Sequence, residues 1–232
     1  MQSNESVEFF NSHPFFREVV NPWQRCQPSV ISVGRKKMLC NETRPLEPRL
    51  FIVNSGIIIE QKVTAKGKTI VRGFRGQGDI LGEISVVENR PLDFTAMALS
   101  SAVCLGIERH FFQALAARQP LLWNRLAQLV SKRFRQQEKM LNDLINQTVR
   151  QRLIGLLLEL ARKFGVQDSR GYLIPKVFTQ EMMSSCIWSS RETVTLALGE
   201  MKREGLLTKN NKEDSRQIIV PDLNQLVAVI AG

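Results

Sequence analysis

Residues 178–195 read Phe-Thr-Gln-Glu-Met-Met-Ser-Ser-Cys-Ile-Trp-Ser-Ser-Arg-Glu-Thr-Val-Thr, and this stretch decides the fold of the C-terminal part of the chain. Thr179 can cap a short helix through its hydroxyl, and apolar residues follow at helical spacing. After a turn, Ser189 or Ser190 can cap a second helix. The stretch therefore predicts a helix-turn-helix.

The second helix begins with three polar side chains, Arg191, Glu192 and Thr193, while Val194 and Leu198 supply its buried face. Arginine can bind guanine through two hydrogen bonds in the major groove, and glutamate can accept one from the amino group of cytosine. Side by side at a helix start, they predict a reader of a G·C-rich step of DNA. The alternative is an ordinary capped helix pair with surface charges.

The composition is that of a globular protein. The chain has 232 residues, 43% of them hydrophobic and 23% charged, which suits one large domain or two modest ones. It contains no run of eighteen apolar residues, so we expect no membrane span. The polar, acidic N-terminus does not resemble a secretion signal, which favours a cytoplasmic location.

The cysteines offer no metal or redox motif, because no two are close enough in sequence for Cys-x-x-Cys. We expect four reduced, mostly buried thiols, although folding could still bring two of them together. They are Cys26, Cys40, Cys104 and Cys186.

The net charge of +10 favours a polyanionic partner. Residues 150–232, which contain the candidate reader, hold 12 Lys and Arg against 9 Asp and Glu. Most of the excess therefore lies elsewhere, and charge supports DNA binding only weakly.

Short strands are predicted between residues 49 and 107. Runs of β-branched residues alternate there with Gly56, Gly67 and Gly78, which are eleven residues apart. Strands of this length with turns at this interval are typical of a small all-β barrel or roll.

A long helix is predicted from residue 121 to 149, where the chain has neither Pro nor Gly. Apolar residues recur at alternating steps of four and three, which is the heptad seam of a dimer interface, and a helix packed within one chain is the alternative. The predicted dimerisation residues are Val130, Phe134, Gln137, Leu141 and Leu144. Leu122, Leu126 and Leu129 line an adjacent face that could pack on the β-domain.

The C-terminal part continues with a helix over residues 150–163, after a hinge near Thr148. A turn rich in Asn and Lys precedes a strand at residues 217–220, which fits the wing of a winged helix. Lys209 and Lys212 in this turn are then free to meet phosphates, or belong to a solvated loop.

In this order of elements and in two motifs, the chain resembles the Crp/Fnr family of bacterial transcription regulators over roughly residues 25–222. Residues 78–83, Gly-Asp-Ile-Leu-Gly-Glu, look like the family's phosphate cassette, and residues 189–194 look like its recognition-helix core.

The resemblance implies an α+β fold: an N-terminal β-roll of the double-stranded β-helix or jelly-roll type, a long dimerisation helix and a C-terminal winged helix-turn-helix. The expected domains are an effector-sensing roll at 1–118, the dimerisation helix at 119–147 and the DNA-binding domain at 148–232.

The resemblance also implies which residues contact DNA: Thr179, Ser189, Ser190, Arg191, Glu192 and Thr193, with Lys209 and Lys212 of the wing. Two positions depart from the family. Leu196 stands where some relatives carry a further DNA-contacting Arg. Trp188 replaces the usual Gly of the turn, so we expect either a reshaped turn or a Trp that fills a gap in the core.

The effector pocket departs further. In cyclic-nucleotide-binding relatives one Arg holds the phosphate, but here Leu92 or Asp93 occupies that position and Arg90 lies two residues early. Gln137 and Glu138 stand where cyclic-AMP relatives offer small hydroxyl residues to adenine. An aromatic or apolar organic acid is therefore favoured over cyclic AMP.

The residues expected to contact the effector are Gly82, Glu83, Ile84, Ser85, Arg90, Thr95 and Gln137. Two N-terminal cysteines cannot hold an iron–sulfur cluster, and His13, in a polar N-terminal stretch, and His110 are interpreted as ordinary histidines rather than haem ligands. No metal site and no definite cofactor are predicted.

The sequence thus predicts a homodimeric, sequence-specific regulator that binds a pseudo-palindromic double-stranded DNA site and is switched by a small molecule. As an activator it would also contact RNA polymerase. Two alternatives remain: a small-molecule-binding module, and an architectural DNA binder that needs no effector. An enzyme is not expected, since the chain has no nucleophile elbow, Walker loop or His–metal motif.

Overall fold

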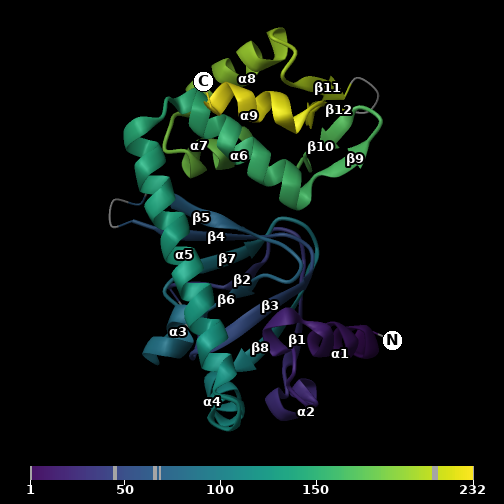
Figure 1. The fold of residues 1–232 in the computed structure, drawn as a ribbon, viewed down its shortest axis with the longest axis vertical. Helices are drawn as coiled ribbons and strands as arrows, with labels where there is room; N and C mark the ends of the chain where they lie inside the picture. The colour runs from purple at the N-terminus through teal and green to yellow at the C-terminus, as the bar shows by residue number, and fades with distance from the viewer. Residues whose placement is uncertain (1, 44–45, 65–66, 68, 211–213, 232) are drawn as a thin grey trace. The chain divides into compact units, whose positions relative to one another are not determined.

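A computed structural model describes the chain apart from residues 1, 44–45, 65–66, 68, 211–213 and 232 (Figure 1). The chain divides into two compact units, Met1–Gln137 and Glu138–Gly232, here called unit 1 and unit 2. The boundary falls within a long helix, α5 (Leu121–Asn146), so the first part of this helix belongs to unit 1 and the rest to unit 2.

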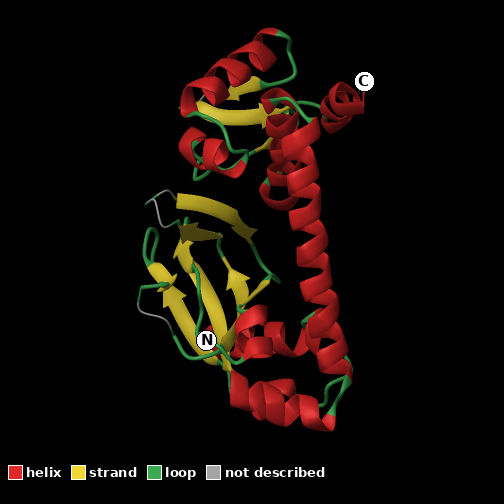
Figure 2. Cartoon of the chain, turned by 90° about the vertical axis from the view of Figure 1, so that its left-hand side faces the viewer, coloured by secondary structure: helices red, strands yellow, loops and turns green. Residues whose placement is uncertain are grey.

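Unit 1 contains the expected β-roll, which consists of two antiparallel four-stranded sheets with the strand orders β1-β8-β3-β6 and β2-β7-β4-β5. Figure 2 shows its strands in yellow and α5 as one continuous helix. The strands are β1 (Ser29–Val33), β2 (Met38–Cys40), β3 (Arg49–Ser55), β4 (Ile58–Val63), β5 (Thr69–Arg75), β6 (Ile80–Leu81), β7 (Thr95–Ala98) and β8 (Ala102–Glu108).

The two sheets enclose an apolar core that includes Phe51, Ile58 and Leu92, each at most 1% exposed. Gly56 joins β3 to β4 with φ +87°, and a Cβ there would lie 2.4 Å from the carbonyl oxygen of Ser101. The turn therefore requires glycine both for its left-handed backbone and for this close approach.

A second apolar cluster lies where the helices of unit 1 cover the roll. Leu122 and Leu126 of α5 are fully buried in it and Leu129 packs against it, which confirms the predicted inner face of the helix. The helices of unit 1 besides α5 are α1 (Gln2–Ser12), η1 (Pro14–Phe16), α2 (Pro22–Cys26), α3 (Glu83–Glu88) and α4 (Arg109–Arg118).

The N-terminal segment is an integral part of this cluster rather than a polar arm. Phe10 and Phe16 are fully buried and stack with ring centroids 4.4 Å apart. His13 lies between them in sequence and is only 5% exposed. The sequence interpretation of a polar N-terminal stretch was wrong, because these aromatic residues cover apolar surface of the roll.

His13 is neutral in this setting. Its Nδ1 accepts a hydrogen bond from the backbone N–H of Phe15 at 3.2 Å, so Nε2 carries the proton and donates to the carbonyl of Gly78 at 2.9 Å. Burial lowers the pKa of His13, although the Gly78 carbonyl and Asp79 act in the opposite direction.

Unit 2 combines a helical bundle with a small sheet of order β11-β12-β10-β9. Thr148 caps α6, and its hydroxyl and the Gln151 side chain form a capping box, which confirms the break between the two long helices. The elements are α6 (Val149–Phe164), β9 (Val166–Asp168), β10 (Gly171–Leu173), α7 (Gln180–Cys186), α8 (Arg191–Arg203), β11 (Thr208–Asn210), β12 (Asp214–Val220) and α9 (Leu223–Ala231).

The burial of His13 makes the stability of unit 1 dependent on pH. The pKa of its imidazole is lowered in the folded chain relative to about 6.5 in the unfolded chain. Below about pH 6.5 the unfolded chain therefore binds more protons, and the stability contributed by neutral His13 is lost as pH falls. At about pH 7.5, His13→Ala is expected to cost about 1–3 kcal/mol, because the Gly78 carbonyl loses its donor.

Urea unfolding followed by circular dichroism at about pH 7.5 and about pH 5.5 measures this difference. The gap between the parent and His13→Ala should narrow at the lower pH. His110→Ala serves as the control, since the His110 side chain is 65% exposed. An equal gap at both pH values would contradict the assignment of a neutral buried imidazole.

Candidate functional site

The helix-turn-helix is formed by α7 and α8, and both helices begin at hydroxyl caps. Thr179 accepts a hydrogen bond from the N–H of Met182 at 3.2 Å, and Ser190 accepts one from the N–H of Thr193 at 3.1 Å. Ser190, rather than Ser189, is therefore the cap of the second helix. These caps fix where α8 starts, and so which side chains occupy its first turn.

The turn between the two helices keeps the left-handed conformation usually taken by glycine. Trp188 has φ +54° and remains 44% exposed, so the turn is not reshaped and the indole does not fill the core. Both expectations for Trp188 were wrong. Arg152 of α6 supports the turn, because its guanidinium donates to the carbonyls of Ile187 at 3.1 Å and Gln147 at 2.7 Å.

The first turn of α8 presents the predicted reading residues to solvent. Arg191, Glu192 and Thr193 are all exposed, while Val194 is fully buried behind them. The pKa of Glu192 is lowered, first by its own backbone N–H, then by the Ser190 hydroxyl, and also by Arg191. Glu192 is therefore an ionised acceptor at neutral pH.

The wing is described only in part. Lys209 lies in β11, but its side chain is outside the described part of the structure. Lys212 is outside it entirely. Phosphate contacts by these two lysines stay a prediction.

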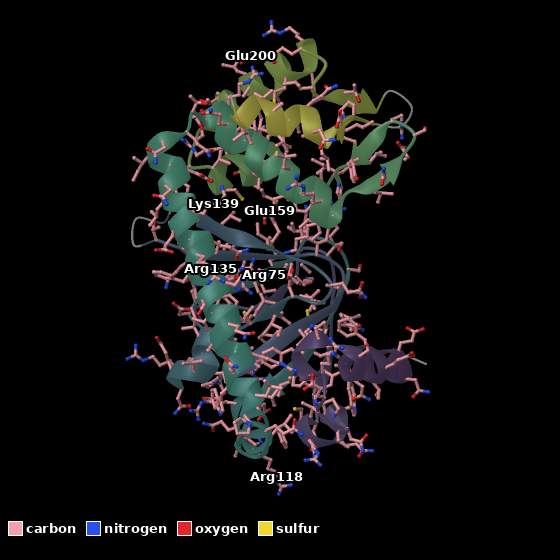
Figure 3. All side chains as sticks on the ribbon, in the orientation of Figure 1. Arg75, Arg118, Arg135, Lys139, Glu159 and Glu200 are labelled. Atoms are coloured by element: carbon pink, nitrogen blue, oxygen red, sulfur yellow. The ribbon has the colours of Figure 1, made fainter. Side chains whose placement is uncertain are left out.

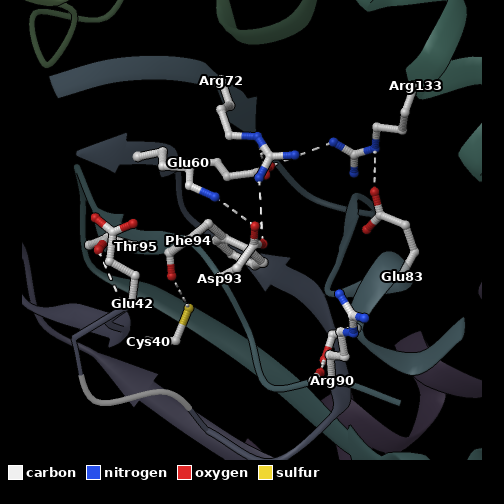
Figure 4. A network of polar contacts seen from close by, with 12 residues as sticks. Cys40, Glu42, Glu60, Arg72, Glu83, Arg90, Asp93, Phe94, Thr95 and Arg133 are labelled. Atoms are coloured by element: carbon white, nitrogen blue, oxygen red, sulfur yellow. Dashed lines mark hydrogen bonds and ion pairs between the residues drawn. The ribbon is translucent and has the colours of Figure 1, made fainter. Parts of the chain in front are cut away.

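Unit 1 contains a buried cluster of charges where α5 meets the roll (Figure 4). Glu60 of β4 lies 2.6 Å from Nη2 of Arg75, 3.5 Å from Nε of Arg72 and 3.7 Å from Nη1 of Arg133. Nε of Arg133 is also 3.1 Å from Oε1 of Glu83. Arg133 thus joins α5 to both the roll and the cassette helix α3.

Guanidinium groups are crowded in this cluster. Arg72, Arg75 and Arg133 all lie within 4.0 Å of Glu60, and the Nε of Arg75 is buried without a hydrogen-bond partner. Arg133 also contacts Glu83, and Arg72 also lies 3.9 Å from Asp93. The pKa of Arg133 is lowered by burial and then by Arg75, against the opposing effect of Glu83, Glu60 and Asp79. An anion placed here would gain an unused N–H donor and would offset the mutual repulsion of the arginines.

The residues predicted for the effector lie around this cluster in different settings. Glu83 and Ser85 are buried on α3, whereas Ile84 between them is 43% exposed. Gly82 has φ +84°, and a Cβ there would lie 2.2 Å from the Arg49 carbonyl oxygen. The loop therefore requires glycine before the cassette helix.

The two candidates for the position of the phosphate-binding Arg have different surroundings. Leu92 is 1% exposed in the core, and Asp93 forms an ion pair with Lys62 at 2.8 Å. Arg90 is exposed, and its carbonyl accepts from the Ser85 hydroxyl.

The last two predicted effector residues are on β7 and α5. Thr95 is buried on β7 and accepts from the N–H of Glu42 at 3.4 Å, whereas Gln137 is exposed on α5.

Sequence reasoning missed four residues of the charge cluster: Glu60, Arg72, Arg75 and Arg133. A partial signal existed for two of them. Glu60 continues a strand whose preceding residues, Ile58 and Ile59, are buried, and Arg133 follows Leu129 by four on the inner face of α5. Nothing in the sequence pairs these positions with each other.

The four cysteines are free thiols in this structure. Burial raises the pKa of Cys26, Cys40 and Cys104 to about 12, and it also raises that of Cys186. Among the described residues, no group of three or more His, Cys, Asp or Glu could hold a metal ion. No helix in the same part of the chain is long and apolar enough to cross a bilayer.

Comparison with known proteins agrees with this arrangement. Residues 30–119 match the cyclic nucleotide-binding domain family, and residues 151–229 match the Crp-like helix-turn-helix domain family. The CRP-like cAMP-activated global transcriptional regulator of Mycobacterium tuberculosis is 25% identical over 178 residues, which cover 77% of this chain and 78% of that protein.

A global nitrogen regulator of Synechocystis is 28% identical and covers 80% of this chain and 83% of its own. Among solved structures, FixK2 from Bradyrhizobium japonicum superposes with a TM-score of 0.74 at 19% identity, covering 88% of this chain and 98% of that one. At this identity, the similarity to FixK2 shows a shared fold alone.

A cyclic-nucleotide-binding-like roll followed by a Crp-like helix-turn-helix defines a DNA-binding transcription regulator. The chain belongs to the Crp/Fnr family.

Arg133 should be a main stabilising contact of unit 1. Arg133→Met leaves Glu60 and Glu83 with one cation fewer in a buried site, and is expected to lower the free energy of unfolding by about 3 kcal/mol. Arg135→Met is the matched control, because Arg135, labelled in Figure 3, is exposed on the same helix. Urea denaturation of both variants measures the effect, and equal midpoints would show that the cluster contributes nothing.

Proposed function

We propose that two copies of this chain bind a pseudo-palindromic DNA site as a sequence-specific regulator, and that a small organic acid bound in the β-roll switches this binding. The proposal rests on the start of α8, where Arg191 and Glu192 directly follow the Ser190 cap and are both exposed to solvent. Side chains at the start of a recognition helix are those that reach base edges in the major groove.

A G·C-rich step is the target that these two side chains suit. The Arg191 guanidinium can donate two parallel hydrogen bonds to the O6 and N7 of guanine. The ionised Glu192 can accept from the amino group of a cytosine. Thr179 and Ser190 lie at the starts of α7 and α8, where backbone N–H groups and hydroxyls suit phosphate contacts.

The outer face of α5 supports a homodimer. Phe134 is 64% exposed and Leu141 is 61% exposed, and both belong to the predicted heptad seam, in which Val130 and Leu144 are partly buried. Ile145 next to the seam is 80% exposed. Large apolar side chains repeated along one helix face favour a partner helix, and a second copy of α5 carries the same face.

An organic acid suits the charge cluster better than a cyclic nucleotide. By the family resemblance, Leu92 or Asp93 stands at the phosphate-binding Arg position, and Leu92 is buried among apolar side chains. A carboxylate can instead use the buried Nε of Arg75 and the neighbouring Arg133, while the apolar body of an aromatic acid suits apolar surroundings. The cyclic AMP response named for the mycobacterial relative is therefore not carried over.

The switch would act through Arg133. An effector carboxylate that competes with Glu60 or Glu83 for this guanidinium changes how α5 is held on the roll. The effector shifts the population only if it binds the DNA-competent state more tightly than the other state. A regulator that activates transcription would in addition present a surface to RNA polymerase.

Arg191→Ala tests the DNA proposal. On a duplex selected by the parent protein from a randomised library, the variant is expected to lose about 1–3 kcal/mol of binding free energy and to tolerate other base pairs at the contacted position. Arg118→Ala removes the same charge from the exposed end of α4 and should leave base preference unchanged. Fluorescence anisotropy at fixed salt measures both. If Arg191→Ala discriminates as well as the parent, then α8 does not read the bases through this residue.

Leu141→Glu tests the dimer. A carboxylate in the seam would face its own copy across the interface and lose solvation, so the variant should sediment as a monomer and lose specific DNA binding. Asn142→Glu adds the same charge at the adjacent exposed position and should remain dimeric. A Leu141→Glu protein that still sediments as a dimer would exclude this face as the interface.

A further inference from the structure

One apolar side chain stands among the exposed polar residues of α8. Leu196 is 69% exposed in the second turn, whereas the core face of the helix buries Val194, Leu198 and Met201. Leu196 therefore contributes nothing to the core of unit 2. On a helix proposed to enter the major groove, this exposed leucine is placed where it can contact DNA.

Leu196 lies on the same face as a proposed reading residue. It follows Glu192 by four positions, so the two side chains are neighbours one turn apart. Three positions further along this face is Gly199, where a Cβ would have no neighbouring atom within 4 Å. Glycine inside a helix costs about 1 kcal/mol relative to alanine, and here no packing within the chain requires it.

Gly199 also lines a groove of about 390 Å³ between α7 and α8. Its other lining residues are Gln180, Thr195, Leu198, Lys202 and Arg203, so two basic residues line the groove. Gly199 has no side chain to keep a partner away, and Lys202 and Arg203 are positively charged. A polyanion such as the DNA backbone can therefore approach this surface closely. The same surface then brings the exposed Leu196 against base edges.

We propose that Leu196 recognises the 5-methyl group of a thymine in the major groove, next to the G·C step read by Arg191 and Glu192. The inference rests on the proposed DNA-reading function. Leucine has no hydrogen-bonding group to offer to the other bases, and thymine is the one base that presents a methyl group in this groove. Contact with this methyl group removes two apolar surfaces from water at once.

The experiment replaces single thymines by deoxyuridine, which pairs in the same way but lacks the 5-methyl group. Duplexes selected by the parent from a randomised library are titrated with the parent and with Leu196→Ala at fixed salt. One deoxyuridine in each half-site should weaken the parent about fourfold per methyl group, the value expected for one buried methylene. Leu196→Ala should bind the thymine duplex more weakly than the parent and lose nothing further with deoxyuridine.

Two controls isolate the contact. Val227→Ala shortens another exposed apolar side chain, 40% exposed on α9, and should retain the full response to deoxyuridine. Deoxyuridine placed outside the half-sites should leave the affinity of the parent unchanged. Circular dichroism checks that each variant keeps the parent's fold.

The inference and the proposed function fail in different ways. If the parent binds selected and random duplexes with equal affinity, both are wrong. If the parent is specific but no thymine is selected beside the G·C step, only the Leu196 inference is wrong. The same conclusion follows if deoxyuridine has no effect on the parent, or if Leu196→Ala keeps the parent's full response to it.

Discussion

The arrangement of unit 1 depends on one buried cation. Arg133 of α5 contacts Glu60 of the roll and Glu83 of the cassette helix, and it donates to the carbonyl of Ile80 as well. Charges in such a site must be paired, because a solitary buried charge is costly. Apolar packing through Leu122 and Leu126 holds the first turns of α5 against the roll, and Arg133 adds ion pairs and a backbone hydrogen bond further along the helix. Arg133 therefore attaches α5 to both the roll and α3 within unit 1.

The DNA-reading part depends on local interactions instead. The hydroxyl caps at Thr179 and Ser190 set the starts of two helices, and the left-handed Trp188 connects them. Arg152 of α6 fastens this turn by a hydrogen bond to the carbonyl of Ile187, and it donates a second one to the carbonyl of Gln147 just before α6. These contacts define the first turn of α8. The residues around this turn therefore suffice to explain why Arg191, Glu192 and Thr193 are exposed. Unit 1 thus depends on contacts between residues distant in sequence, whereas the helix-turn-helix depends on local ones.

This difference explains how much the sequence could predict. The caps, the glycine-punctuated strands and the inner face of α5 follow from short-range patterns, and the structure agrees with them. The cluster around Glu60 could not be predicted, because it joins residues on β4, β5, α3 and α5 that no spacing rule relates. The buried setting of His13 could not be predicted for the same reason, since its partner Gly78 is 65 residues away. Trp188 was misjudged because glycine is the usual left-handed residue, although other residues can adopt that backbone when the surroundings hold it.

The proposal that an organic acid rather than a cyclic nucleotide binds the charge cluster is tested most directly by a thermal-shift titration. The panel consists of cyclic AMP, cyclic GMP, haem, phenols and aromatic carboxylic acids, applied to the parent and to Arg75→Met. A ligand that binds only the folded protein adds about 2.7 kcal/mol at a hundred times its dissociation constant. The account predicts a shift with an aromatic acid, absent in Arg75→Met, and none with the nucleotides. Stabilisation by cyclic AMP that persists in Arg75→Met, with no response to any acid, would contradict it.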